Sequence, residues 1–182
     1  MHFSQKSWIV LSVFVLAFIL VPASHAQLNS NNATVNLNAI LAESLTVAAG
    51  PATINFALVP NGTAPGSAPA SITTTWALAK TRTSVKLYAY FASANALTDG
   101  VGDNIPTSKV TGSVNGGAAA AFTSATPFGA NGMTVFTQAI GGAGTFNSTH
   151  GPDTIAMTID TTGLALPAAT YTGVLNIQAQ AL

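Results

Sequence analysis

The chain has 182 residues, with five Lys and Arg against five Asp and Glu and no Cys; 48% of its residues are hydrophobic and 5% are charged. A nucleic-acid-binding protein needs an excess of basic residues, and a disulfide framework or a Cys-ligated zinc site needs cysteine, so these classes are excluded. The apolar content also excludes an intrinsically disordered chain, because such chains are rich in charge and poor in hydrophobic residues.

The first segment of the chain has the layout of a secretory signal peptide. Lys6 precedes an apolar run from Trp8 to Val21, and the small residues Ser24 and Ala26 follow it. This order predicts cleavage after Ala26. The run is shorter than the about 20 apolar residues of a membrane span. We therefore expect residues 1–26 to be a signal peptide and residues 27–182 to form one exported domain, secreted or at the cell surface, without a transmembrane segment.

An alternating segment begins soon after the predicted cleavage site. In residues 33–41 apolar side chains alternate with Thr34, Asn36 and Asn38; the alternating apolar positions are Ala33, Val35, Leu37, Ala39 and Leu41. A period of two predicts a β-strand. An isolated strand is not stable, so this one either pairs within its own sheet or is donated to a neighbouring subunit, and the sequence leaves both open. Val35, Leu37 and Leu41 are its candidate partner-binding residues.

The same periodicity predicts further strands along the chain. Their inward positions are Ile72, Thr74 and Trp76; Val85, Leu87, Ala89 and Phe91; Ile155, Met157 and Ile159; and, in a final strand within 171–182, Leu175 and Ile177. Turn-forming residues separate them at Pro60-Asn61-Gly62, Asp99-Gly100, Asn115-Gly116-Gly117 and Gly151-Pro152-Asp153. Short strands separated by such turns predict an all-β, antiparallel, immunoglobulin-like sandwich without helices. Leu175 and Ile177 join the candidate partner-binding residues, because the final strand carries no charged side chain.

The residues that carry chemistry are few and scattered. One histidine, His150, remains after cleavage, and no G-x-S-x-G nucleophile motif occurs. We therefore expect neither an enzyme nor a cofactor. Asp99, Asp103 and Asn104 form a weak calcium candidate, because oxygen ligands at nearby positions suit Ca²⁺. Tyr88 and Tyr90 share a face with Lys86 and are candidates for stacking on a glycan.

Three features resemble the secreted bacterial β-sandwiches of the fimbrial-subunit and spore-coat-U type. They are the signal peptide followed at once by ATVNLNAIL (33–41), the charge-poor body rich in Thr, Ala and Asn, and the ending PAATYTGVLNIQAQAL (167–182). The resemblance implies a pilin-like sandwich that serves as a structural subunit of a cell-surface or coat assembly. We expect a subunit that self-associates through strand edges, with copies of itself or other surface subunits as partners; the alternative is a monomeric module that binds glycans or surfaces.

Overall fold

The computed structural model describes residues 30–123 and 132–182, so the predicted signal peptide, 1–26, lies outside the described residues. The chain divides into two units, Met1–Ala39 and Ile40–Leu182. In the first unit, residues 30–39 form neither helix nor strand, and their side chains are exposed. All the named strands belong to the second unit.

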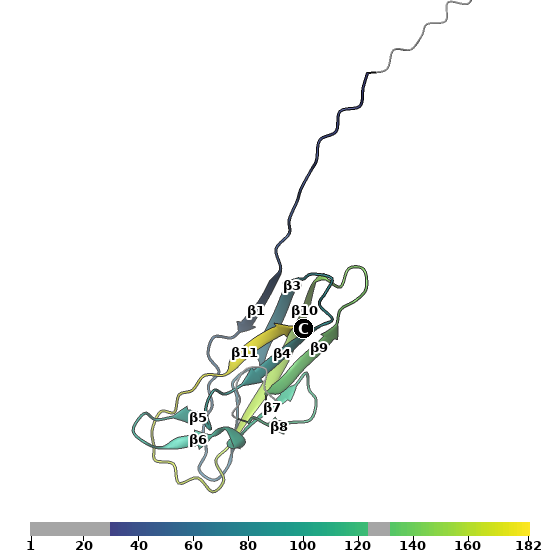
Figure 1. Ribbon diagram of the computed structural model, residues 1–182. Helices are drawn as coiled ribbons and strands as arrows, with labels where there is room; N and C mark the ends of the chain where they lie inside the picture. Colours follow the sequence, from purple (N-terminus) through teal and green to yellow (C-terminus); the bar gives the residue numbers. More distant parts are fainter. Residues whose placement is uncertain (1–29, 124–131) are drawn as a thin grey trace, which may run out of the picture. The chain divides into compact units, whose positions relative to one another are not determined.

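The elements of the second unit are almost all strands (Figure 1). One short 3-10 helix, η1, spans Thr107–Lys109 among them. The strands, in chain order, are β1 (Ser44–Gly50), β2 (Thr63–Pro65), β3 (Ala70–Ala77), β4 (Ser84–Tyr90), β5 (Asn95–Thr98), β6 (Asn104–Pro106), β7 (Val110–Val114), β8 (Ala120–Ala121), β9 (Met133–Ala139), β10 (Asn147–Asp160) and β11 (Asn176–Ala181).

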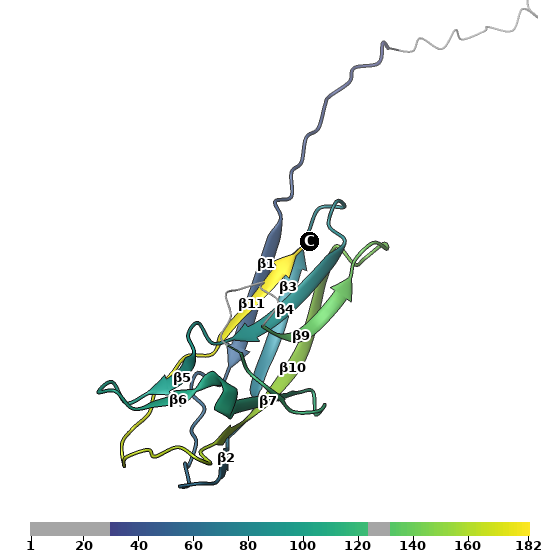
Figure 2. The ribbon, with the colours of Figure 1, turned by 60° about the horizontal axis from the view of Figure 1, so that its bottom comes forward.

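These strands form two main sheets and a separate hairpin, as Figures 1 and 2 show. The larger sheet has the order β1-β3-β10-β7-β8, with β2 pairing to β10, and the smaller sheet has the order β11-β4-β9. β5 and β6 form the hairpin. The pairings between named strands are all antiparallel. The prediction of an all-β, antiparallel fold is therefore confirmed.

The core lies between the two main sheets, and the alternating residues form it. Ile72 and Trp76 of β3 face Val85, Leu87 and Ala89 of β4, and all five side chains are at most 2% exposed. From β10, Ile155 and Ile159 join the same cluster. Burying a large aliphatic or aromatic side chain contributes about 1.5–3 kcal/mol, so the period of two in these strands selects which face becomes the core.

The predicted strand at residues 33–41 is wrong for the described chain. Residues 30–43 have no strand, and the first strand is β1, which begins at Ser44. Val35, Leu37 and Leu41 are 82%, 93% and 81% exposed. Alternation decides which side chains share a face, but a strand also needs a neighbouring backbone to pair with. Among the described residues, no strand pairing involves residues 33–41.

The predicted turn at Gly151-Pro152-Asp153 is also wrong. These residues lie inside β10, whose register with β3 shifts between His150 and Asp153. Gly151 has φ +115, so the glycine supplies the backbone conformation of a bulge while the strand continues beyond it. A bulge adds residues to one strand without reversing the direction of the chain. Because bulges and turns use the same residue types, the sequence of this segment predicts a turn where the structure has a bulge.

Candidate interaction site

β1 and β11 each have one edge that pairs with no other described strand. β1 pairs with β3, and β11 pairs with β4, but the two are not paired with each other although they lie side by side (Figures 1 and 2). We call these two free edges the open edge. Unpaired strand edges present a row of backbone donors and acceptors and are templates for pairing with another chain.

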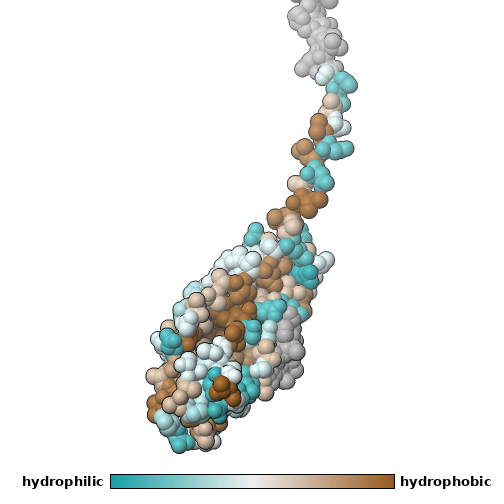
Figure 3. Space-filling view, turned by 90° about the vertical axis from the view of Figure 1, so that its left-hand side faces the viewer, coloured by the Kyte–Doolittle hydropathy of each residue, from teal (hydrophilic) through white to brown (hydrophobic). Residues whose placement is uncertain are grey.

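Apolar side chains along the open edge are only half buried. In the view that faces this side, apolar residues gather on the surface (Figure 3). β11 carries no charged side chain, whereas natural edge strands are commonly guarded by charges or proline. The half-buried residues are Leu45 and Val47 of β1, with Leu175, Ile177 and Ala179 at β11. Of the predicted residues, Ile177 thus lies in β11, at the open edge, and Leu175 lies immediately before that strand.

A cavity of about 220 Å³ adjoins the beginning of β11. Its lining includes Phe91, Leu97 and Val174. Val174 is 71% exposed, and Gly173 packs so closely on β5 that an added Cβ would lie 1.9 Å from the carbonyl oxygen of Ala96. Polar residues, among them Asn95, Thr98 and Asn176, also line it, so the cavity continues the open edge past the first residue of β11 with a mixed apolar and polar surface.

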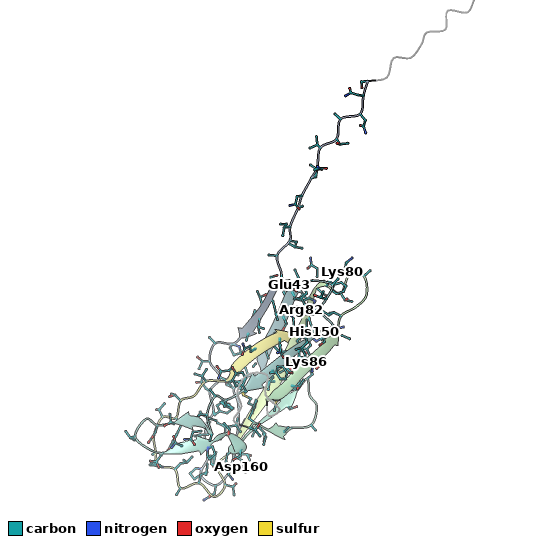
Figure 4. The ribbon with its side chains drawn as sticks, viewed as in Figure 1. Glu43, Lys80, Arg82, Lys86, His150 and Asp160 are labelled. Carbon is teal, nitrogen blue, oxygen red and sulfur yellow. The ribbon has the colours of Figure 1, made fainter. Side chains whose placement is uncertain are left out.

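A charged clamp lies where β1 begins. The Glu43 carboxylate accepts hydrogen bonds from the backbone N–H of Ala79 (2.8 Å) and from Arg82 Nε (3.1 Å) and Nη2 (3.0 Å). Arg82 Nη1 also donates to the carbonyl oxygen of Ala181, at 3.5 Å. Figure 4 shows Glu43 and Arg82 together at this end of the second unit. The clamp ties the start of β1 to the β3–β4 connection and to the end of β11.

Acid is expected to weaken this clamp. The hydrogen bonds from Arg82 and from Ala79 lower the pKa of Glu43 from 4.5 to about 2. Because the folded-state pKa is the lower one, the contribution to stability is complete above the unfolded pKa and is lost as the pH falls through about 2. The Tm difference between wild type and Glu43→Gln should therefore be positive at neutral pH and should shrink toward pH 2. The difference should be small, because the pair is exposed to solvent.

Thermal denaturation of both proteins across this range measures that difference. Both proteins carry the same remaining carboxylates, so their common acid destabilisation cancels. A Tm difference that stays constant from neutral pH down to about pH 2 would show that the ionised Glu43 carboxylate does not stabilise the fold through this clamp.

The two tyrosines predicted as glycan contacts differ in burial. Tyr90 is 8% exposed, and its hydroxyl donates to Gln178 Oε1 at 3.3 Å. Tyr88 is half buried on the same strand. A stacking platform needs an accessible ring face. Because Tyr90 packs against β11, it offers little ring surface to a sugar.

The calcium candidates lie at the β5–β6 turn: Asp99 and Asp103 are in the turn, and Asn104 is the first residue of β6. Asp99 Oδ1 accepts hydrogen bonds from the backbone N–H groups of Val101, Gly102 and Asp103, at 2.9, 3.1 and 3.0 Å. These bonds lower the pKa of Asp99. Asn104 Nδ2 donates to the Gly102 carbonyl oxygen at 2.9 Å. Within the described residues, no group of three His, Cys, Asp or Glu side chains gathers as metal ligands. The polar side chains of Asp99 and Asn104 thus serve to close the turn.

A buried polar contact that the sequence did not reveal joins β10 to the turn after β7. Asp153 is 4% exposed, and its Oδ1 accepts a hydrogen bond from Asn115 Nδ2 at 2.8 Å. His150 Nε2 lies 3.4 Å from Asp153 Oδ2, and the His150 ring stacks on Phe136 at 4.1 Å between centroids. Asn115 and Asp153 are far apart in sequence. The only sign of this contact in the sequence is that each residue belongs to a run of turn-forming residues. The contacts hold the bulge of β10 in place.

Comparison of the chain with family models, with curated proteins and with solved structures gives no match. Across residues 30–123 and 132–182, no helix has the length and hydropathy of a membrane span.

Proposed function

We propose that this protein is a non-enzymatic structural subunit of an exported surface assembly, and that its copies associate through β-strand edges. The open edge carries the proposal: half-buried apolar side chains line two unpaired strand edges in a chain that also has an exposed, alternating apolar segment at 33–41. The low charge of the chain supports contact between copies, because like charges would otherwise oppose close packing.

The apolar segment has the size and pattern that such an edge would accept. Nine residues in an extended conformation span about 30 Å, longer than β1 or β11. Full burial of Val35, Leu37 or Leu41 would contribute about 1.5–3 kcal/mol each. Backbone pairing along the edge would add hydrogen bonds of the same kind that join β11 to β4. The segment and the open edge therefore complement each other chemically.

Placing a charge on the apolar side of the segment is expected to weaken association. In the mature protein, Leu37→Asp should raise the dissociation constant by about tenfold or more, because a buried leucine is lost and a carboxylate must be desolvated. Asn36→Asp is the matched control: it adds the same charge at the neighbouring position, which faces the other way. Sedimentation velocity over a series of protein concentrations measures both effects. The proposal fails if wild-type protein is monomeric at every concentration, or if both variants weaken association equally.

A further inference from the structure

We propose that His150 and Asp153 form a binding site for a single Zn²⁺ ion at the bulge of β10. The position of the two side chains, the distance between their ligand atoms and a buried carboxylate oxygen without a hydrogen bond support this assignment. The site lies within one chain, so it does not depend on the proposed association of copies.

The bulge of β10 brings His150 and Asp153 to the same face of the sheet. In a regular strand, side chains three positions apart point to opposite faces. Here the register with β3 shifts between the two residues, and their partners Thr74 and Ile72 are both 0% exposed, so both pairs lie on the core side. An added Cβ at Gly151 would lie 2.5 Å from the carbonyl oxygen of Ile72. Glycine at the bulge is therefore a condition for this arrangement of the two ligands.

The distance between the two side chains fits two ligands of one tetrahedral zinc ion. His150 Nε2 lies 3.4 Å from Asp153 Oδ2. A Zn–N bond of about 2.0–2.1 Å and a Zn–O bond of about 2.0–2.2 Å at a tetrahedral angle place the ligand atoms about 3.4 Å apart. A right angle, as in square-planar Cu²⁺, would place them about 2.9 Å apart at the same bond lengths. The His150 side chain is 35% exposed, so water can reach the ion and complete its coordination.

Asp153 is a buried carboxylate without a lysine or arginine partner. Its side chain is 6% exposed, and among the ion pairs of the described residues it pairs with His150 alone. Its Oδ2 accepts no hydrogen bond from the part of the chain that the structure describes. Thr74, which lies opposite His150 in the register, has a second such buried oxygen. Buried carboxylates are paired or coordinate metals, and buried polar atoms without partners indicate a bound ion or water.

Neighbouring residues hold both ligand groups in a fixed orientation. Asn115 Nδ2 donates to Asp153 Oδ1 at 2.8 Å, and Asn115 Oδ1 accepts a hydrogen bond from the backbone N–H of Thr154 at 2.7 Å. The His150 ring stacks on Phe136 of β9, with 4.1 Å between the centroids. Outer contacts of this kind orient metal ligands and strengthen metal binding. Because Oδ1 is engaged by Asn115, Oδ2 is the oxygen that remains for the ion.

Calorimetric titration with ZnCl₂ tests the site in the mature protein, residues 27–182, without a polyhistidine tag. His150 is then the only histidine, and we expect one Zn²⁺ to bind per chain. His150→Gln should weaken binding by about tenfold or more, because a ligand is lost. Asp103→Asn is the matched control, since it removes a carboxylate from the β5–β6 turn and should bind Zn²⁺ as wild type does. If wild type binds no Zn²⁺, or if both variants lose affinity equally, the inference is wrong.

Thermal denaturation gives a second measurement. At a Zn²⁺ concentration tenfold above the dissociation constant, the wild-type Tm should rise by about 3–6 °C, and the Tm of His150→Gln should stay constant. Asp153→Asn should lose the Tm rise as well; the half-exposed His150→Gln keeps the test decisive if Asp153→Asn does not fold. A Tm rise that persists in His150→Gln would overturn the inference.

Nuclear magnetic resonance of the single histidine identifies the ligand atom. Addition of Zn²⁺ should change the ¹⁵N chemical shift of His150 Nε2 more than that of Nδ1, because Nε2 is the nitrogen that faces Asp153. A larger change at Nδ1, or no change at either nitrogen, would contradict the site and leave the histidine and the carboxylate as a pair that shares only a proton.

Discussion

Replacing Trp76 by alanine is expected to lower the free energy of unfolding by about 3–5 kcal/mol. Trp76 lies on β3, is 2% exposed and belongs to the core between the two sheets. Its indole N–H donates to the carbonyl oxygen of Thr145 at 2.8 Å, which joins β3 to the segment before β10. The substitution removes the ring from a closely packed interior and leaves a cavity that the surrounding strands fill only in part. Urea denaturation measures the loss as a lower midpoint at unchanged slope.

Trp76→Phe separates packing from the hydrogen bond. Phenylalanine keeps much of the apolar volume but cannot donate to Thr145, so the loss should be about 1–2 kcal/mol. The hydrogen bond to the Thr145 carbonyl oxygen is only partly buried, so a water molecule can replace the indole N–H as its donor in part. Equal losses for the two variants would show that the ring does not fill the core as described.

Replacing Gly173 by alanine is expected to cost about 3 kcal/mol, at the upper end of typical overpacking. The added Cβ would lie 1.9 Å from the carbonyl oxygen of Ala96 and 2.9 Å from its carbonyl carbon. Both are backbone atoms and cannot move as the tip of a flexible side chain does. The neighbouring residues Thr98 and Thr172 exchange two backbone hydrogen bonds of 2.9 Å, so moving the segments apart would also weaken that bridge.

Gly141→Ala is the matched control for this change. No atom lies within 4 Å of a Cβ built at Gly141. The same chemical change should therefore leave the midpoint of denaturation nearly unchanged there. A midpoint for Gly173→Ala that also equals wild type would contradict the close approach of the chain before β11 to β5. Because Gly173 lines the cavity, the Gly173→Ala variant also tests how closely the chain packs at the end of the open edge.

The strands that could be predicted are those buried between the sheets. In β3, β4 and β10 one face is covered and the other is not, so the transfer of apolar side chains from water imposes a period of two on the sequence. Trp76, Leu87 and Ile155 all follow that pattern and all lie in the core. The antiparallel sandwich followed from several such strands joined by short turns.

The rest depends on pairing between distant residues, which the pattern of one segment does not encode. Residues 33–41 alternate about as regularly as β1, yet only β1 forms a strand, because β3 pairs with it. The contact of Asn115 with Asp153 was missed for the same reason, since each residue alone has the composition of a turn. Leu175 and Ile177 were correctly placed in or next to the final strand, but their position at an unpaired edge follows only from the order of the sheets.

The open edge has a consequence for how an assembly would grow. If the segment 33–41 of one copy fills the open edge of the next in the proposed association, a string of copies has two chemically different tips. One tip would show an unfilled acceptor and the other a donor without a recipient. Addition at the two tips then follows different steps, and growth is directional. A chain that can accept but not donate would end a string at one tip while leaving the other tip free to elongate.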